Sequence, residues 1–93
     1  MIETGRFLNV STCNVRKETC EWLSNYEQTS GSGLVVYLKR EYGYFVYWDH
    51  DEPLTGIPAD LLQVIDLADF LECELICIDR DAPVVKHLPK YDW

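Results

Sequence analysis

The sequence predicts a single α+β domain in which two helices cover one face of a four-stranded, mainly antiparallel sheet. Three observations support this: a strong hairpin signal in the middle of the chain, two segments with helical spacing, and a short apolar run near each end. The resulting order is strand, helix, strand, strand, helix, strand, as in a ferredoxin-like sandwich or a related four-stranded sheet. With 93 residues, 47% of them hydrophobic, we expect one domain over residues 1–93.

The first strand and the first helix are predicted in the first 26 residues. Residues 7–11 form a short apolar run, which we interpret as a strand. Asn14 stands where it can cap a following helix. That helix carries an apolar stripe with helical spacing, made of Val15, Thr19, Trp22, Leu23 and Tyr26. Residues 28–33 are polar and contain two glycines, so they predict a flexible surface loop.

The hairpin is expected in the middle of the chain. Residues 34–39 and 44–49 are rich in β-branched and aromatic side chains. Between them, residues 40–43 suit a turn, with Gly43 available for a positive φ. Alternation along both strands leaves two largely apolar faces, so we expect helices on one face and the tail or a partner on the other.

The second helix, the last strand and a tail complete the predicted domain. Pro58 suits the first position of a helix. Apolar residues at helical spacing then give its core stripe, which consists of Leu61, Val64, Ile65, Ala68 and Leu71. Residues 75–78 form the last strand. Residues 80–93 contain two prolines and no period, so we expect an extended C-terminal tail packed on the body.

The negative charge is concentrated in one third of the chain. Residues 49–81 hold ten acids against Arg80 alone, a net charge of −9 within a total of −8. Such a field repels nucleic acid and attracts basic surfaces. We therefore expect a protein partner with a basic surface and no direct contact with nucleic acid. No apolar run approaches the about 20 residues of a membrane span, and no signal peptide is visible, which predicts a cytoplasmic protein without membrane contact.

The second helix provides the predicted partner-binding acidic face. This face combines carboxylates with two apolar side chains and consists of Asp60, Leu62, Asp66, Asp69, Phe70 and Glu72. Two alternatives remain open. The tail could cover Leu62 and Phe70, or these two side chains and the second face of the hairpin could form a homodimer interface. The acidic charge could also serve solubility alone.

A candidate polar site carries the only visible catalytic potential. It consists of Asp49, His50, Asp79, Arg80 and Asp81, and it underlies the less favoured alternative of a small metal-dependent enzyme. We expect instead that residues 49–52 are a solvated loop and that Arg80 pairs with a neighbouring carboxylate. His87 has no nucleophile at a motif spacing. We therefore predict no catalytic residues and no cofactor.

The cysteines are predicted to be free thiols that pack as small hydrophobic side chains. A chain expected in the cytoplasm keeps its thiols reduced. Zinc knuckles usually separate their cysteines by two residues, and neither of the two spacings here does so. Those spacings join Cys13 to Cys20 and Cys73 to Cys77. We therefore predict no metal site.

Three segments resemble an uncharacterised bacterial domain family carried on plasmids, integrated elements and prophages. They are residues 8–12 with Glu18-Thr19, residues 42–47 (YGYFVY), and the closing stretch DRDAPVV…LPxYDW over residues 79–93. The chain departs from the family pattern at Asn14, where a histidine is expected. The resemblance implies an accessory gene of a mobile element and no assigned activity.

Together, the acidic field and this resemblance predict a small, non-enzymatic protein-binding module of a bacterial mobile element. A narrower hypothesis is that the module mimics nucleic acid and so blocks a basic host protein. The alternative from another class is a homo-oligomerising structural module.

Overall fold

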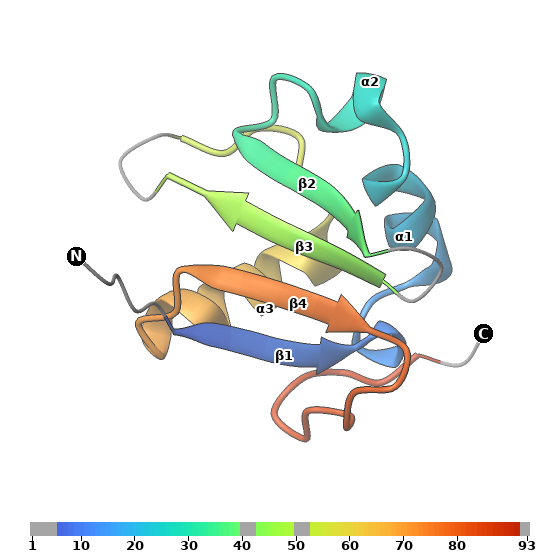
Figure 1. Ribbon diagram of the computed structural model, residues 1–93, viewed down its shortest axis with the longest axis vertical. Helices are drawn as coiled ribbons and strands as arrows, with labels where there is room; N and C mark the ends of the chain where they lie inside the picture. Colours follow the sequence, from blue (N-terminus) through green and yellow to red (C-terminus); the bar gives the residue numbers. More distant parts are fainter. Residues whose placement is uncertain (1–5, 40–42, 50–52, 92–93) are drawn as a thin grey trace.

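The computed structural model describes residues 6–39, 43–49 and 53–91 (Figure 1). Its elements in chain order are β1 (Phe7–Ser11), the 3₁₀ turn η1 (Thr12–Asn14), α1 (Lys17–Leu23), α2 (Tyr26–Thr29), β2 (Leu34–Lys39), β3 (Gly43–Trp48), α3 (Ala59–Phe70) and β4 (Leu75–Asp79). The α+β class and the predicted strand and helix order are confirmed. The four predicted strands all form, and the first predicted helix is replaced by two shorter ones.

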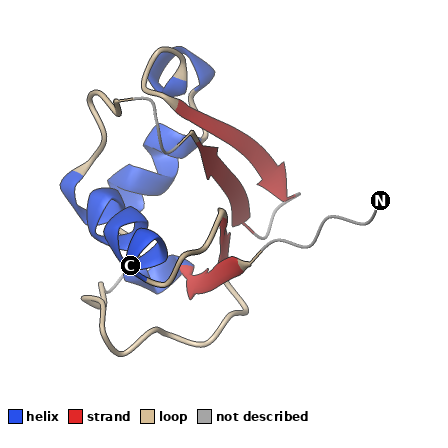
Figure 2. Ribbon diagram, turned by 90° about the vertical axis from the view of Figure 1, so that its left-hand side faces the viewer, coloured by secondary structure: helices blue, strands red, loops and turns tan. Residues whose placement is uncertain are grey.

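The sheet is mixed, in the order β1-β4-β3-β2. β3 is antiparallel to both β2 and β4, whereas β4 runs parallel to β1. In a ferredoxin-like sandwich the first and last strands are antiparallel, so this topology is one of the related four-stranded sheets. Helices α1 and α3 lie against one face of the sheet, and the other face is left open (Figure 2).

The core lies between the sheet and α3. Across the inner strands, Val46 pairs with Ile76, and Ile78 with Val10, so these four side chains share the inner face. All four have no exposed surface. They are covered by the buried stripe of α3, which the sequence predicts correctly up to the last residue: Leu61, Val64, Ile65 and Ala68 are buried. Leu71 follows the helix and is 38% exposed.

The open face of the sheet carries apolar side chains in register. Val35, Tyr47, Leu75 and Phe7 form one row across the four strands. Of these, Val35 is 49% exposed and Phe7 59% exposed, because no described segment packs on this side. Tyr37, also 59% exposed, packs edge-on against Tyr47 with 5.7 Å between the ring centroids.

The single helix predicted after Val15 is wrong. The chain leaves the helix at Ser24, whose hydroxyl donates to the Cys20 carbonyl at 3.0 Å. At the start of α2, the Asn25 side-chain oxygen accepts the Glu27 N–H at 3.0 Å. Ser and Asn side chains compete in this way for backbone hydrogen bonds. The helical spacing of apolar residues in the sequence continues across Ser24 and Asn25, so the periodicity does not reveal the break.

The predicted flexible loop is in fact anchored. Thr29 and Ser32 are buried, and both the side chain and the backbone of Ser32 form hydrogen bonds. Its hydroxyl donates to the Thr29 carbonyl at 2.5 Å, and its own carbonyl accepts the Thr55 N–H at 2.9 Å. Gly33 has a φ of 95°, and a Cβ there would lie 2.9 Å from Leu54 Cδ2. The turn therefore packs against residues 53–55, which no local pattern predicts.

Gly43 is required for close packing between strands and not for a turn conformation. It is the first residue of β3 and has no positive φ, so the predicted role is wrong. A Cβ at this position would lie 1.7 Å from the Ile78 carbonyl oxygen of β4. Only glycine lets the two strands approach here. The turn predicted at residues 40–42 lies outside the described residues.

The C-terminal segment after β4 returns to the start of the domain and lies beside η1 (Figure 1). The Tyr91 N–H donates to the Cys13 carbonyl at 2.7 Å. Val85 and Leu88 pack against the core as partly buried side chains. This segment therefore lies away from Phe70, which is 83% exposed, and does not cover it. Residues 92 and 93 of the predicted tail lie outside the described residues.

Candidate functional site

The exposed side of α3 and the turn after it carry five of the six residues predicted to bind a partner. We call this surface the α3 face, and it consists of Leu62, Asp66, Asp69, Phe70 and Glu72. All five are exposed. Within α3, positions 62, 66 and 69 are three or four residues apart and share one side of the helix. The α3 face therefore presents carboxylates and apolar side chains together.

Asp60, the sixth predicted residue, does not belong to this surface. It is buried, with 7% of its surface exposed, in the first turn of α3. One carboxylate oxygen accepts the backbone N–H of Arg16 at 2.7 Å. The Thr19 hydroxyl lies 2.7 and 2.6 Å from the two oxygens. Asp60 thus binds the N-terminus of α1. Its negative charge also interacts favourably with the positive end of the helix dipole there.

The helix-cap role predicted for Asn14 is wrong, and Asp60 contacts the start of α1 instead. Arg16 is the N-cap of α1 and makes no side-chain capping bond. Asn14 is buried within η1, with 1% of its surface exposed. Its amide instead holds the C-terminal segment: Nδ2 donates to the carbonyls of Val85 at 3.2 Å and Pro89 at 3.0 Å, and Oδ1 accepts the Val85 N–H at 2.9 Å.

Phe70 is the most exposed of the large apolar side chains on the described surface, at 83%. It is the last residue of α3, and Leu71, 38% exposed, follows it. Asp69 beside it is anchored, because its carboxylate accepts the Trp48 indole N–H at 3.3 Å. An aromatic side chain is therefore exposed to water at the end of α3, directly after an anchored carboxylate.

Glu72 adopts a left-handed conformation, with a φ of 59°, and is the only described non-glycine residue with a positive φ. Its N–H donates to Asp69 and the next N–H, of Cys73, donates to Ala68 at 2.8 Å. These two bonds close the C-terminus of α3 in the manner of a Schellman motif, where glycine is usual at this position. Glutamate here costs about 1 kcal/mol relative to glycine.

The structure does not bring Asp49 and Asp79 of the candidate polar site together. β3 and β4 are antiparallel, with Tyr47 opposite Leu75 and Gly43 opposite Asp79. Asp49 therefore lies beyond the start of β4, whereas Asp79 is at its end. The two carboxylates are separated by the length of the strand, about 13 Å or more. His50 lies outside the described residues.

The residues that follow β4 form a local turn. The Asp79 carboxylate accepts the Asp81 N–H at 2.9 Å, and Arg80 and Asp81 are exposed. Asp79 and Arg80 each take part in further interactions. Within residues 6–39, 43–49 and 53–91, no three Asp, Glu, His or Cys side chains are grouped closely enough to hold a metal ion.

The cysteines are all free, and three of the four are buried. Cys20 lies in α1 near the Asp60 carboxylate. Burial, with smaller contributions from the negative charges of Asp60 and Glu21, raises the pKa of the Cys20 thiol to about 11. A thiol with such a pKa is protonated at neutral pH and is a poor nucleophile.

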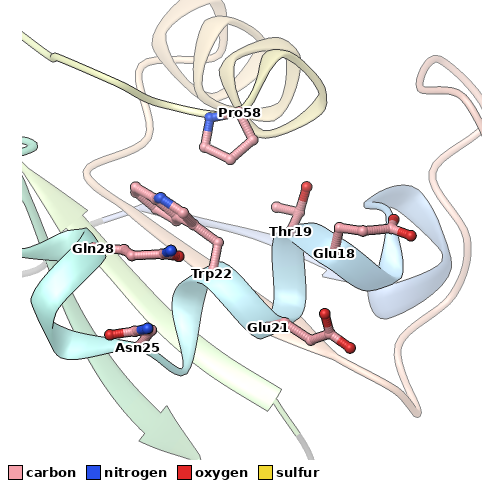
Figure 3. Close-up of a pocket in the computed structure, with 7 residues that line it drawn as sticks. All are labelled: Glu18, Thr19, Glu21, Trp22, Asn25, Gln28 and Pro58. Carbon is pink, nitrogen blue, oxygen red and sulfur yellow. The ribbon is translucent and has the colours of Figure 1, made fainter.

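An open groove of about 470 Å³ lies between α1, α2 and the start of α3 (Figure 3). The residues that line it are Glu18, Thr19, Glu21, Trp22, Asn25, Gln28 and Pro58. Figure 3 shows the Trp22 indole between Pro58 and Gln28, with the two glutamates towards the other end of α1. Trp22 was predicted as part of the apolar stripe of the first helix, and neither glutamate was predicted as a site residue. The spacing of residues 18, 21, 22 and 25 was the signal that could have joined them on one helix face.

No helix in the described part of the chain has the length and apolar character needed to cross a membrane. No curated protein and no solved structure matches this chain. A family model does match, over residues 7–93, and its description is the C-terminal domain of a family of unknown function, DUF5983. Since the match covers nearly all of the sequence and all of the sheet, the chain belongs to the DUF5983 family.

Proposed function

We propose that this chain is a protein-binding module that docks through the α3 face onto a partner with an apolar pocket surrounded by basic residues. The observation that supports this proposal is Phe70, whose ring is 83% exposed at the end of α3. Aromatic side chains that enter a pocket on the partner supply much of the energy of protein interfaces. Asp66, Asp69 and Glu72 on the same face favour a partner with lysine and arginine at the rim of that pocket.

The conformation of Glu72 supports the same proposal. A glycine would close α3 at lower energy, yet the chain places a carboxylate there, with a φ of 59°. Residues held in unfavourable backbone conformations are concentrated at functional sites. A carboxylate that contacts the partner would account for the glutamate.

A narrower form of the proposal names the kind of partner. We propose a cytoplasmic bacterial protein that binds nucleic acid, with the module encoded by a mobile element. Asp66, Asp69 and Glu72 would then take the place of phosphates in the basic groove of that protein. Phe70 would add an apolar contact that nucleic acid lacks.

The test is capture from a lysate of the source cells, at about 0.1 M and 0.5 M salt, since screening weakens contacts between exposed charges. The captured protein is then purified and titrated with variants. Phe70→Ser is expected to weaken binding by about tenfold or more. The matched control Phe7→Ser removes an equally large apolar side chain from the open sheet face and is expected to leave affinity unchanged.

Glu72→Gly gives a second, sharper result. We expect this change to raise the stability of the free protein by up to about 1 kcal/mol, because it relieves the left-handed conformation, and to weaken partner binding. The proposal fails if Phe70→Ser and Phe7→Ser bind alike, or if binding does not depend on salt. Competition between the module and DNA or RNA for the captured partner decides whether the module mimics nucleic acid.

A homo-oligomer is the second candidate, favoured by the open sheet face with Phe7, Val35, Tyr37 and Tyr47 exposed. The helices, α3 among them, lie on the other side of the sheet from this face (Figure 2). We therefore propose an interface formed by the open sheet face alone, without Leu62 and Phe70. If the sheet face self-associates, the mass measured by light scattering should rise with concentration, and Phe7→Ser should return it to that of a monomer.

A further inference from the structure

The groove of Figure 3 has a lining suited to one planar cation. Glu18 lies three residues before Glu21 and four before Trp22 on α1, so these side chains are neighbours on the helix, and Asn25 follows its end. Pro58 and Gln28 close the groove beside Trp22. Trp22 itself is half-buried and packs partly against the core, which fixes its position.

The charge of the groove is unbalanced. Its seven lining residues include two carboxylates, Glu18 and Glu21, and no base. Both glutamates are exposed, and neither forms a hydrogen bond or ion pair with any other part of the chain that the structure describes. Anionic ligands are therefore disfavoured, and a cation would gain carboxylate partners without breaking an existing pair.

From this combination we infer that the groove binds an arginine side chain of a protein partner. A guanidinium group is planar and stacks on aromatic rings, as Trp22 offers here. Its N–H groups can donate to the amide oxygens of Asn25 and Gln28 on the side of the ring, and the carboxylates of Glu18 and Glu21, towards the other end of α1, attract its charge. A lysine ammonium is a compact charge that uses the flat indole surface less well.

The inference rests on the proposed function in one respect, because the arginine would belong to the same basic partner. The groove and the α3 face are separate, however. Pro58 precedes α3 and Phe70 ends it, so the 12-residue helix separates them by about 18 Å. A partner that contacts both would carry its arginine at that distance from its apolar pocket.

The experiment tests the groove without the partner. The probe is the peptide acetyl-Gly-Arg-Gly-amide, titrated into ¹⁵N-labelled protein and followed by NMR. Trp22→Phe identifies the indole N–H signal of Trp22. We expect saturable shifts of that signal and of α1 amides, and no saturable shift with a citrulline peptide, which has the same shape but no charge.

Charge variants locate the binding site. Glu18→Gln and Glu21→Gln should each weaken binding of the arginine peptide by about two- to fivefold. Glu27→Gln is the matched control, because Glu27 is exposed on α2 and does not line the groove. All three residues are exposed, so the fold should not change.

The inference is overturned if the arginine peptide produces no saturable shift, if citrulline or lysine peptides bind as tightly, or if Glu27→Gln weakens binding as much as Glu18→Gln. Each of these results leaves the test of Phe70 on the captured partner untouched. Conversely, if Phe70→Ser has no effect on the partner while the arginine peptide binds at Trp22, the α3 proposal fails and the groove remains.

Discussion

Replacing Asp60 with alanine is expected to lower the free energy of unfolding by about 3 kcal/mol. The carboxylate is buried and accepts hydrogen bonds from the Arg16 N–H and the Thr19 hydroxyl. Hydrogen bonds to a charged group contribute about 1.5–3 kcal/mol each, and removing the acceptor leaves both donors without a partner in the protein. Chemical denaturation of Asp60→Ala and of the unchanged protein measures the difference.

Asp66→Ala is the matched control for this experiment. It removes the same carboxylate from the same helix, but at an exposed position, and should change stability by less than about 0.5 kcal/mol. A double-mutant cycle with Thr19→Val is expected to give a coupling energy of about 1–3 kcal/mol. Equal effects of Asp60→Ala and Asp66→Ala would contradict the structural role of Asp60.

The result affects how the acidic surface is tested. Neutralising Asp60 along with Asp66, Asp69 and Glu72 would weaken α1 packing as well as the surface charge. Loss of binding in such a variant could then come from the fold. Variants that remove charge from the α3 face should therefore leave Asp60 in place.

Asn14→Asp is expected to release the C-terminal segment from the body. The change keeps the size of the side chain but replaces the Nδ2 donor with an oxygen, which faces the carbonyls of Val85 and Pro89. Two hydrogen bonds become repulsive contacts at a site that is 1% exposed. We expect a loss of about 2–3 kcal/mol in unfolding free energy.

Limited trypsin digestion measures the release directly. Lys86 and Lys90 lie in the segment that Asn14 holds, and both are exposed. Cleavage after these lysines should be faster in Asn14→Asp than in the unchanged protein, while the sheet and helices stay intact. Asn9→Asp, on the exposed side of β1, is the control and should be cleaved at the original rate. Equal rates in all three proteins would show that the amide of Asn14 does not hold the segment.

The local pattern of the sequence was sufficient to predict the four strands and α3. Alternating apolar residues specify the hairpin, and the stripe from Leu61 to Ala68 specifies which side of α3 is buried. It left open whether the C-terminal tail covers Phe70, which falls outside that stripe and is exposed in the structure. These features depend on residues that are close in the chain, and the periods of helices and strands are local properties.

The roles of single polar residues could not be predicted in this way. Asp60 appeared to be one of several surface acids, and Asn14 appeared to be a helix cap. Their partners are distant in sequence: Thr19 is 41 residues from Asp60, and Val85 is 71 residues from Asn14. A short polar side chain is equally suited to a cap, a surface or a buried contact, and only the surrounding fold selects among them.

The sequence by itself determined the α+β class, the order of the elements and the overall excess of acid. Tertiary structure alone decided how that acid is distributed. Folding buries Asp60, places Asp49 and Asp79 at opposite ends of the β3–β4 pair, and leaves Asp66, Asp69 and Glu72 exposed on the α3 face with Phe70. The physical reason is that charge is additive along the chain, whereas a binding surface depends on which side chains the fold leaves exposed and adjacent.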